Sequence, residues 1–155
     1  YDKLHSYLNI PDTSNRDSLF QAEARRCKVI LDDIIVNRNK EHFCIFDELY
    51  SGTNPIEASM AGYAYLKYLN NFKNVKFILT THYLDMCERL EGMCEDKSIV
   101  NNNMKAYYKN DKLVCSYKLQ KGITKLNGGV EVLRKLNYKK EIIDDAMNYN
   151  KNVFV

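Results

Sequence analysis

The stretch FCIFDELYSGTNPIEA, residues Phe43 to Ala58, decides the fold that we expect for this chain. It begins with an apolar run, Phe43–Phe46, whose lack of alternation is typical of a central strand covered on both faces. Two adjacent acids and a glycine turn follow. The segment NPIE, starting at Asn54, then supplies an N-cap, a proline at the first helical position and an early acid. The stretch therefore predicts a buried strand, a turn that carries two carboxylates, and a helix.

The alternation of helix and strand continues on both sides of this stretch. Upstream, apolar residues recur at the helical period from Ser18, and Ser18 with Gln21 fits a capping box. Downstream, Val75–Thr80 has the composition of a second buried strand, and Tyr83–Leu90 that of a short helix. Helix, strand, helix, strand, helix is an α/β pattern, so we expect a parallel sheet flanked by helices.

The C-terminal third has a different expected pattern of secondary structure. Two strands joined by a polar turn are expected there, followed by two short helices. Their expected ranges are Ser98–Tyr108, Lys112–Leu119, Gly129–Leu136 and Lys139–Tyr149. We therefore divide the chain into residues 1–122, which hold the sheet and an appended β-hairpin, and a helical tail, residues 123–155.

Composition narrows the function classes. The 155 residues are 45% hydrophobic and 28% charged, which suits one domain or part of one. No apolar run is long enough to span a membrane, no signal peptide is evident, and the five cysteines form no C-x-x-C pair. We expect reduced thiols, with Cys27 and Cys44 in the core, and a cytoplasmic or nuclear location. The net charge of +3 is too small to predict nucleic-acid binding by itself.

The two acids after the first buried strand are candidates for chemistry. In open α/β sheets, ligands bind at the carboxyl ends of the strands, where Asp47 and Glu48 are expected. An apolar strand ending in Asp-Glu is the Walker B pattern of P-loop ATPases, in which the first acid holds Mg²⁺ and the second polarises the attacking water. The next strand ends in FILTTH, which places His82 at the equivalent edge. Together these residues favour a nucleotide site, and the alternative is a simple solvated turn.

These motifs carry a family resemblance. The segments FDELYSGTNPIEA and TTHY resemble the ATPase domain of the MutS superfamily, whose members have D-E-x-x-x-G-T and T-H-Y segments at about this separation. Upstream, DSLFQAE, Asp17 to Glu23, resembles the S-T-F-x-x-E signature of the family. Downstream, the hairpin and closing helices are also similar, so the resemblance covers about residues 8–150. It implies a P-loop NTPase fold of the ABC-ATPase type. It also implies the C-terminal half of a DNA mismatch repair or recombination ATPase, which binds and hydrolyses ATP at a dimer interface.

The resemblance also implies roles for individual residues. Asp47 would be the Mg²⁺-associated acid, Glu48 the catalytic base and His82 the switch histidine that senses the γ-phosphate. Ser18 would be the signature serine, offered with its helix N-terminus to ATP on the partner subunit. The turn facing the other subunit would be Ser51, Gly52 and Thr53. ATP and Mg²⁺ are the implied cofactors, and the implied partners are a second MutS-like subunit and DNA, which is bound by domains outside the chain.

The sequence departs from the family pattern in two ways. Arg16 stands where the family commonly has a glycine, and no G-x-x-x-x-G-K-[ST] loop occurs in the 155 residues. We therefore expect this chain to be the C-terminal portion of a longer protein and to be inactive as an ATPase alone. Two alternatives stay open: a non-catalytic MutS-like dimerisation module, and a fragment of another ABC-type ATPase that acts in chromosome maintenance.

Three other features of the sequence give weaker indications of function. A basic stretch near the C-terminus is more typical of a solvated face than of DNA contact. By resemblance, the helical tail is a dimerisation element. His42 and Cys44 alternate on the expected strand and have side chains that bind metals, but no partner lies at zinc spacing, so the sequence favours no metal site there.

Overall fold

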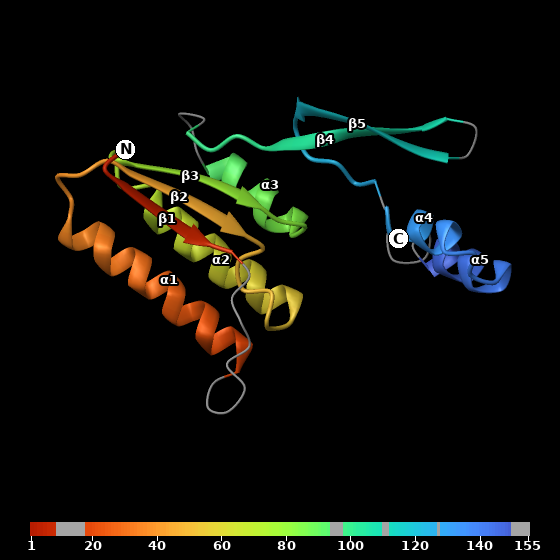
Figure 1. The fold of residues 1–155 in the computed structure, drawn as a ribbon, viewed down its shortest axis with the longest axis horizontal. Helices are drawn as coiled ribbons and strands as arrows, with labels where there is room; N and C mark the ends of the chain where they lie inside the picture. Colours follow the sequence, from red (N-terminus) through yellow and green to blue (C-terminus); the bar gives the residue numbers. More distant parts are fainter. Residues whose placement is uncertain (9–17, 94–97, 110–111, 127, 150–155) are drawn as a thin grey trace. The chain divides into compact units, whose positions relative to one another are not determined.

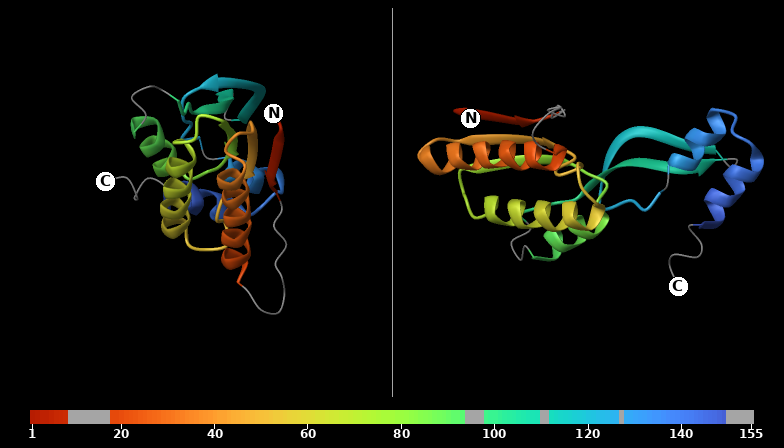
Figure 2. Two further views of the ribbon diagram at one scale, coloured as in Figure 1. Left: turned by 90° about the vertical axis from the view of Figure 1, so that its left-hand side faces the viewer. Right: turned by 90° about the horizontal axis from the view of Figure 1, so that it is seen from below.

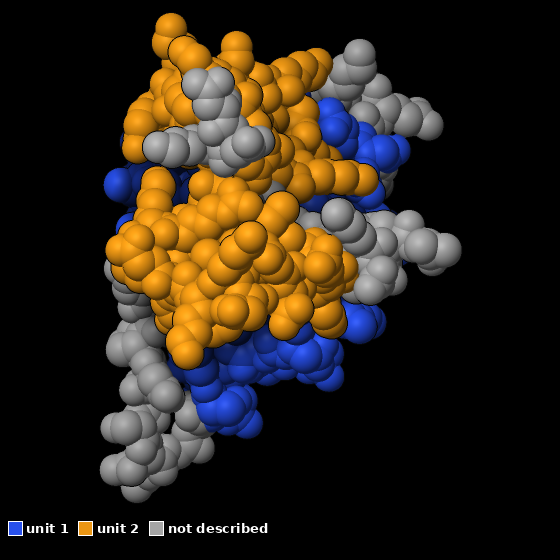
Figure 3. Space-filling view, turned by 90° about the vertical axis from the view of Figure 1, so that its right-hand side faces the viewer, with its two compact units in different colours: residues 1–100 blue, residues 101–155 orange. Residues whose placement is uncertain are grey.

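The computed structural model describes residues 1–8, 18–93, 98–109, 112–126 and 128–149 (Figure 1). It divides into two compact units, residues 1–100 and 101–155, which Figure 3 colours separately. This division falls before the β-hairpin, whereas the boundary expected from the sequence lies after it. None of the helices within the described ranges has the length and apolar character needed to cross a membrane.

The first unit is an α/β structure, as expected. Its elements in chain order are β1 (Lys3–Tyr7), α1 (Leu19–Val36), β2 (His42–Asp47), α2 (Pro55–Leu69), β3 (Val75–Thr80) and α3 (Leu84–Met93). The strands form one parallel sheet in the order β1-β2-β3, so the predicted parallel sheet and the central position of β2 are confirmed. β1 was not expected from the sequence.

The helices α1 and α2 lie on the same face of this sheet (Figures 1 and 2). Burial along β2 accordingly alternates: Cys44 and Phe46 point into the core, whereas Phe43 and Ile45 are only half-buried. The prediction that this strand is covered on both faces is therefore wrong for the described residues. An unbroken apolar run does not by itself distinguish a strand covered on one face from one covered on two.

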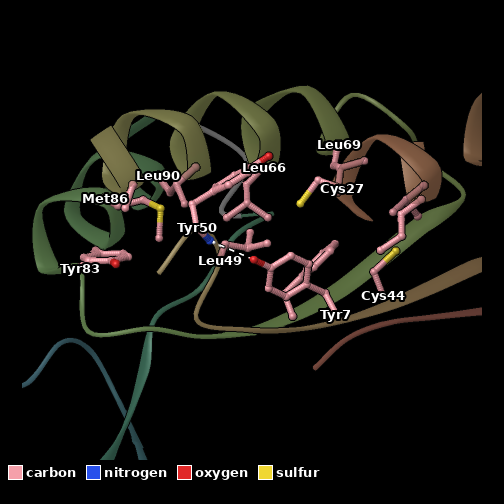
Figure 4. Packing of buried hydrophobic residues seen from close by; sticks show 14 of the residues in the cluster. Tyr7, Cys27, Cys44, Leu49, Tyr50, Leu66, Leu69, Tyr83, Met86 and Leu90 are labelled. Atoms are coloured by element: carbon pink, nitrogen blue, oxygen red, sulfur yellow. Dashed lines mark hydrogen bonds between the residues drawn. The ribbon is translucent and has the colours of Figure 1, made fainter. Parts of the chain in front are cut away.

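The core fills the space between the sheet and the helices (Figure 4). Cys27 of α1 and Cys44 of β2 are 1% and 0% exposed, which confirms their predicted core positions. Tyr7 of β1 is buried beside Phe46, with ring centroids 6.3 Å apart. The Tyr7 hydroxyl accepts a hydrogen bond from the backbone N–H of Tyr50 at 3.2 Å. This bond ties the loop after β2 to the edge strand.

Both long helices begin where their capping residues predict. Ser18 Oγ accepts from the backbone N–H of Gln21 at 3.3 Å, and the Gln21 side chain accepts from the Ser18 N–H at 2.9 Å. This confirms the capping box. Asn54 Oδ1 accepts from the N–H of Glu57 at 3.0 Å, and Pro55 occupies the first turn of α2. Caps of this kind are worth about 1 kcal/mol each, and they fix where the preceding loops end.

The second unit consists of a hairpin and a helical pair. Its elements are β4 (Asn102–Lys109), β5 (Lys112–Lys121), α4 (Gly129–Lys135) and α5 (Lys140–Tyr149). The two strands are antiparallel and pair with each other, which confirms the predicted hairpin. In α4, Arg134 forms a 2.8 Å ion pair with the largely buried Glu131, and its guanidinium also reaches Met147 of α5 at 2.9 Å.

Candidate functional site

Asp47 is the last residue of β2, at the carboxyl edge of the sheet. It pairs in register with Thr80, the last residue of β3, and the Thr80 hydroxyl donates a hydrogen bond to its carboxylate. Both residues are exposed to solvent. The parallel register therefore brings an oriented carboxylate and a hydroxyl together where α/β sheets bind ligands.

Glu48 begins the loop after β2 and meets His82 from the loop after β3. His82 Nδ1 lies 3.5 Å from Glu48 Oε1, and both side chains are more than half exposed. The Glu48 backbone N–H donates to the Thr80 carbonyl at 2.9 Å, which extends the strand pairing by one residue. The His82 ring also packs on the Tyr83 ring, with centroids 4.7 Å apart. The two strands thus place a carboxylate beside an imidazole.

The backbone of this loop is unusual for residues with side chains. Glu48 has φ 49° and Tyr50 has φ 62°, both in the left-handed region. Such a conformation costs on the order of 1–3 kcal/mol per residue and persists only where surrounding contacts impose it. Here the buried Leu49 and Tyr50 side chains supply those contacts, because they anchor the loop in the core. Their burial leaves Glu48 pointing to solvent.

A buried carboxylate holds the next part of the loop. Glu23 of α1 is only 2% exposed, and its two oxygens accept hydrogen bonds from Ser51 Oγ and from the Gly52 N–H, each at 3.0 Å. An ionised carboxylate is an acceptor-only group, so this pairing of two donors with two oxygens satisfies it. Glu23 therefore connects α1 to the loop that follows the two acids.

Gly52 packs directly on the start of the same helix. A Cβ at this position would lie 2.7 Å from the backbone nitrogen of Phe20 and 2.7 Å from Leu19 Cγ. Only glycine permits this approach without movement of the backbone. The loop 51–53 and the N-terminus of α1, where Ser18 lies, are therefore in contact within one chain.

The predicted site residues thus fall into three groups. Asp47, Glu48 and His82 lie at the carboxyl edge of the sheet, whereas Ser51 and Gly52 are joined to α1. The Thr53 hydroxyl donates a hydrogen bond to Glu57 Oε2 of α2 at 2.6 Å. Arg16 and Asp17, beside and at the start of the DSLFQAE motif, lie outside the described residues.

Comparison with known proteins decides the family. The model of MutS domain V matches residues 1–153 of the chain. The chain belongs to the MutS family. It is 30% identical over 113 residues to Endonuclease MutS2 of Lactococcus lactis subsp. cremoris, covering 73% of the chain and 14% of the relative. It is also 30% identical over 132 residues to Endonuclease MutS2 of Fusobacterium nucleatum, covering 85% and 16%.

A relative with a different name is also similar. DNA mismatch repair protein MutS of Persephonella marina is 27% identical over 114 residues, which cover 74% of the chain and 14% of that protein. The chain therefore spans about one seventh of the length of the curated MutS relatives it matches. The match of the MutS domain V model over nearly the whole chain confirms the MutS family to which the DELYSGT and TTHY segments pointed.

Sequence reasoning did not assign a site role to Glu23 or Thr80. Glu23 stands within the quoted DSLFQAE motif, and a signal was available: it is an acid on the apolar stripe of α1, beside Ala24 and one turn before Cys27. Thr80 precedes the TH pair, and only the parallel register shows that it faces Asp47.

Proposed function

We propose that this chain is the C-terminal part of a MutS-type ATPase domain with a P-loop fold. In this proposal it binds and hydrolyses ATP at the interface of two MutS-like subunits and so controls DNA binding by domains outside the chain. The observation that carries the proposal is the meeting of Asp47 with Thr80, and of Glu48 with His82, at the carboxyl edge of one parallel sheet.

The donor set fits a nucleotide–magnesium site. Asp47 offers an exposed carboxylate oriented by the Thr80 hydroxyl, and oxygen ligands of this kind suit Mg²⁺. Asp47 would hold the ion, whose charge would neutralise phosphate oxygens during transfer. A phosphate-binding loop would come from sequence outside these 155 residues. The two MutS2 relatives are long enough to contain one elsewhere, because the chain covers only 14% and 16% of their length.

In this proposal Glu48 would orient a water molecule and accept its proton. The backbone bond to Thr80 fixes its position, and the imidazole of His82 lies beside its carboxylate. A positioned base of this kind contributes roughly 10²–10⁴-fold to a rate, or about 3–5 kcal/mol of barrier. His82 would report the state of the γ-phosphate through its contact with Glu48.

The signature helix supplies the second half of the proposal. Its capped N-terminus presents Ser18 to solvent, and the dipole of the helix favours an anion there. Glu23 and Gly52 hold the loop 51–53 against this helix. A partner subunit approaching with bound ATP would therefore meet one rigid surface made of the helix end and the loop.

Replacement of Glu48 tests the proposal. In a protein that contains this chain together with a phosphate-binding loop, we expect Glu48→Gln to lower the ATP turnover number by roughly 10²–10⁴-fold. Nucleotide affinity should change little, because the substitution removes a base and retains the side-chain shape. Turnover is measured by phosphate release, and affinity by equilibrium binding of ATP at a fixed Mg²⁺ concentration.

The matched control is Glu41→Gln, which removes an exposed carboxylate at the amino end of β2. Its turnover should equal that of the unmodified protein. Unchanged turnover in Glu48→Gln would remove Glu48 from its role. Absence of ATP binding in the unmodified, folded protein would instead favour the alternative of a non-catalytic MutS-like dimerisation module. We also expect the 155-residue chain alone to show no Mg²⁺-dependent turnover.

A further inference from the structure

A second cluster of chemically active side chains lies at the opposite, amino end of the sheet. It joins His5 of β1, His42 of β2 and Asp33 of α1. The two histidines are 9% and 0% exposed, and the Asp33 side chain is one third exposed. One ligand atom from each residue lies within 4.8 Å of the others. Three different elements therefore direct nitrogen and oxygen donors toward one point.

The hydrogen bonds around the cluster determine which atoms face one another. His42 Nε2 lies 3.0 Å from the Asn37 carbonyl, which only accepts, so Nε2 carries the proton and Nδ1 has the lone pair. His42 Nδ1 is 2.9 Å from His5 Nε2, and the two rings are stacked with an interplanar angle of 10°. His5 Nε2 is in turn 3.7 Å from Asp33 Oδ2.

The remaining oxygen of the aspartate is already occupied. Asp33 Oδ1 accepts from Lys3 Nζ at 3.1 Å and from Asn37 Nδ2 at 2.9 Å. These two bonds orient the carboxylate and turn Oδ2 toward His5. The Asn37 carbonyl does the same for the His42 ring. Ordered partners behind the ligands are typical of metal sites, where they fix the ring orientation and the tautomer.

We propose that His5, His42 and Asp33 form a binding site for a divalent transition-metal ion of the Zn²⁺ class. Zinc–nitrogen bonds of 2.0–2.1 Å at tetrahedral angles place two ring nitrogens about 3.3 Å apart, a few tenths of an ångström more than in this structure. A small opening of the histidine pair therefore accommodates the ion. The partly exposed Asp33 leaves the fourth position for water.

The chemistry of the donors selects the class of ion. Two imidazole nitrogens and one carboxylate suit Zn²⁺, Co²⁺ or Cu²⁺, whereas Mg²⁺ prefers oxygen ligands alone. Without a metal ion, His5 Nε2–H donates to the lone pair on His42 Nδ1. When a metal ion binds, this proton moves to His5 Nδ1, and the charge of the ring does not change. Lys3 offsets the charge of Asp33, which makes the protein part of the site neutral.

The site is independent of the proposed ATPase centre. His42 opens β2, whereas Asp47 closes the same strand, so the two sites lie at opposite ends of the sheet. A metal ion here would link the edge strand β1 to β2 and α1. We therefore expect the ion to stabilise the first unit against unfolding and to leave ATP chemistry unaltered.

Titration with Co²⁺ and Zn²⁺ tests the site. The purified protein is stripped with a chelator and titrated with Co²⁺ in excess Mg²⁺, and binding is followed by the visible absorption of tetrahedral Co²⁺. We expect one ion per chain, displaced by Zn²⁺, together with a rise in the thermal unfolding midpoint. His5→Gln should weaken binding by roughly 100-fold or more. Substitution of a residue that only hydrogen-bonds to a ligand already lowers metal affinity by about 10–100-fold, and His5 is itself a ligand.

Two controls separate this site from adventitious binding. The chain has three histidines, and His82→Ala removes the one outside the cluster while retaining full Co²⁺ affinity. Asp33→Asn should weaken binding, whereas Asp32→Asn, whose carboxylate pairs with the exposed Lys28, should not. Circular dichroism checks the fold of each variant. If His5→Gln does not fold, X-ray absorption of the Zn²⁺-loaded protein still counts the imidazole ligands.

The proposal is overturned by either of two results. One is the absence of saturable Co²⁺ or Zn²⁺ binding by the folded protein. The other is binding that His82→Ala abolishes and His5→Gln leaves intact, which would assign the ion to the exposed Glu48–His82 edge.

Discussion

The buried Glu23 carboxylate gives the sharpest test of how the loop after β2 is held. It accepts two hydrogen bonds, from Ser51 Oγ and the Gly52 N–H. Hydrogen bonds to charged groups contribute about 1.5–3 kcal/mol each, so about 3–6 kcal/mol is the upper bound for the pair. Ser51 and Gly52 are not fully buried, and water replaces part of this. We expect Glu23→Met to lower the free energy of unfolding by about 2–4 kcal/mol.

A second substitution at position 23 should lower the free energy of unfolding by a smaller amount. Glu23→Gln keeps one carbonyl acceptor for the Gly52 N–H, and its amide can donate to the Ser51 hydroxyl. We therefore expect a smaller loss, about 1–2 kcal/mol. Urea unfolding with linear extrapolation measures both values, followed by tyrosine fluorescence because the chain has no tryptophan. The exposed Glu41→Gln is the control and should stay within about 0.5 kcal/mol.

A double-mutant cycle with Ser51→Ala assigns the effect to the contact itself. Residues that share a hydrogen bond couple by about 0.5–3 kcal/mol, whereas independent sites add. We expect coupling between Glu23→Met and Ser51→Ala, since either change removes the same bond. A loss below about 0.5 kcal/mol for Glu23→Met, or strict additivity in the cycle, would refute the view that Glu23 holds this loop.

Two further predictions concern packing and thiol reactivity. Gly52→Ala should lower the free energy of unfolding by about 1–3 kcal/mol, because its Cβ meets the backbone at the start of α1. A Cβ at Gly92 meets nothing within 4 Å, so Gly92→Ala should be neutral or slightly stabilising in the same urea experiment. Burial raises the pKa of Cys27 and Cys44 to about 12, so about one thiol in 10⁴ is ionised at pH 8. In a short iodoacetamide pulse analysed by peptide mass spectrometry, the exposed Cys115 should be labelled and these two should not; rapid labelling of either in the folded chain would contradict the buried assignment.

The elements of the fold that could be predicted are those with local signals. Ser18 and Asn54 mark helix starts through bonds that span only three residues, and the structure has both helices starting there. The strand β3 has the predicted bounds, because its apolar run is flanked by polar turns on both sides. β1 was missed, since the segment KLHSY has neither an apolar run nor a regular alternation of apolar and polar residues, and it forms a strand through pairing with distant β2.

The same distinction applies to the two sites. The motif around Asp47 and Glu48 is contiguous in sequence, so their position at the strand end was predictable, and the parallel order of the strands brought His82 beside Glu48. The cluster around His42 was not predictable. Its partners His5 and Asp33 come from an unpredicted strand and from a helix whose exact rotation the sequence does not specify.

The exposure of the catalytic candidates constrains how the site can work. Glu48 and His82 are 52% and 65% exposed at their side chains, and a contact this accessible to water contributes at most about 1 kcal/mol. Rate enhancements of the size expected for a positioned base need a water-excluding environment in which electrostatic interactions strengthen. The described residues hold Glu48 in place through Leu49, Tyr50 and the β3 backbone, but they do not cover it. In the proposed ATPase, the chain would therefore supply the position of Glu48, and a bound nucleotide, another part of the protein or a second subunit would exclude water from the site. This is the physical reason to expect that activity depends on an assembled interface and that Glu48→Gln has its effect only there.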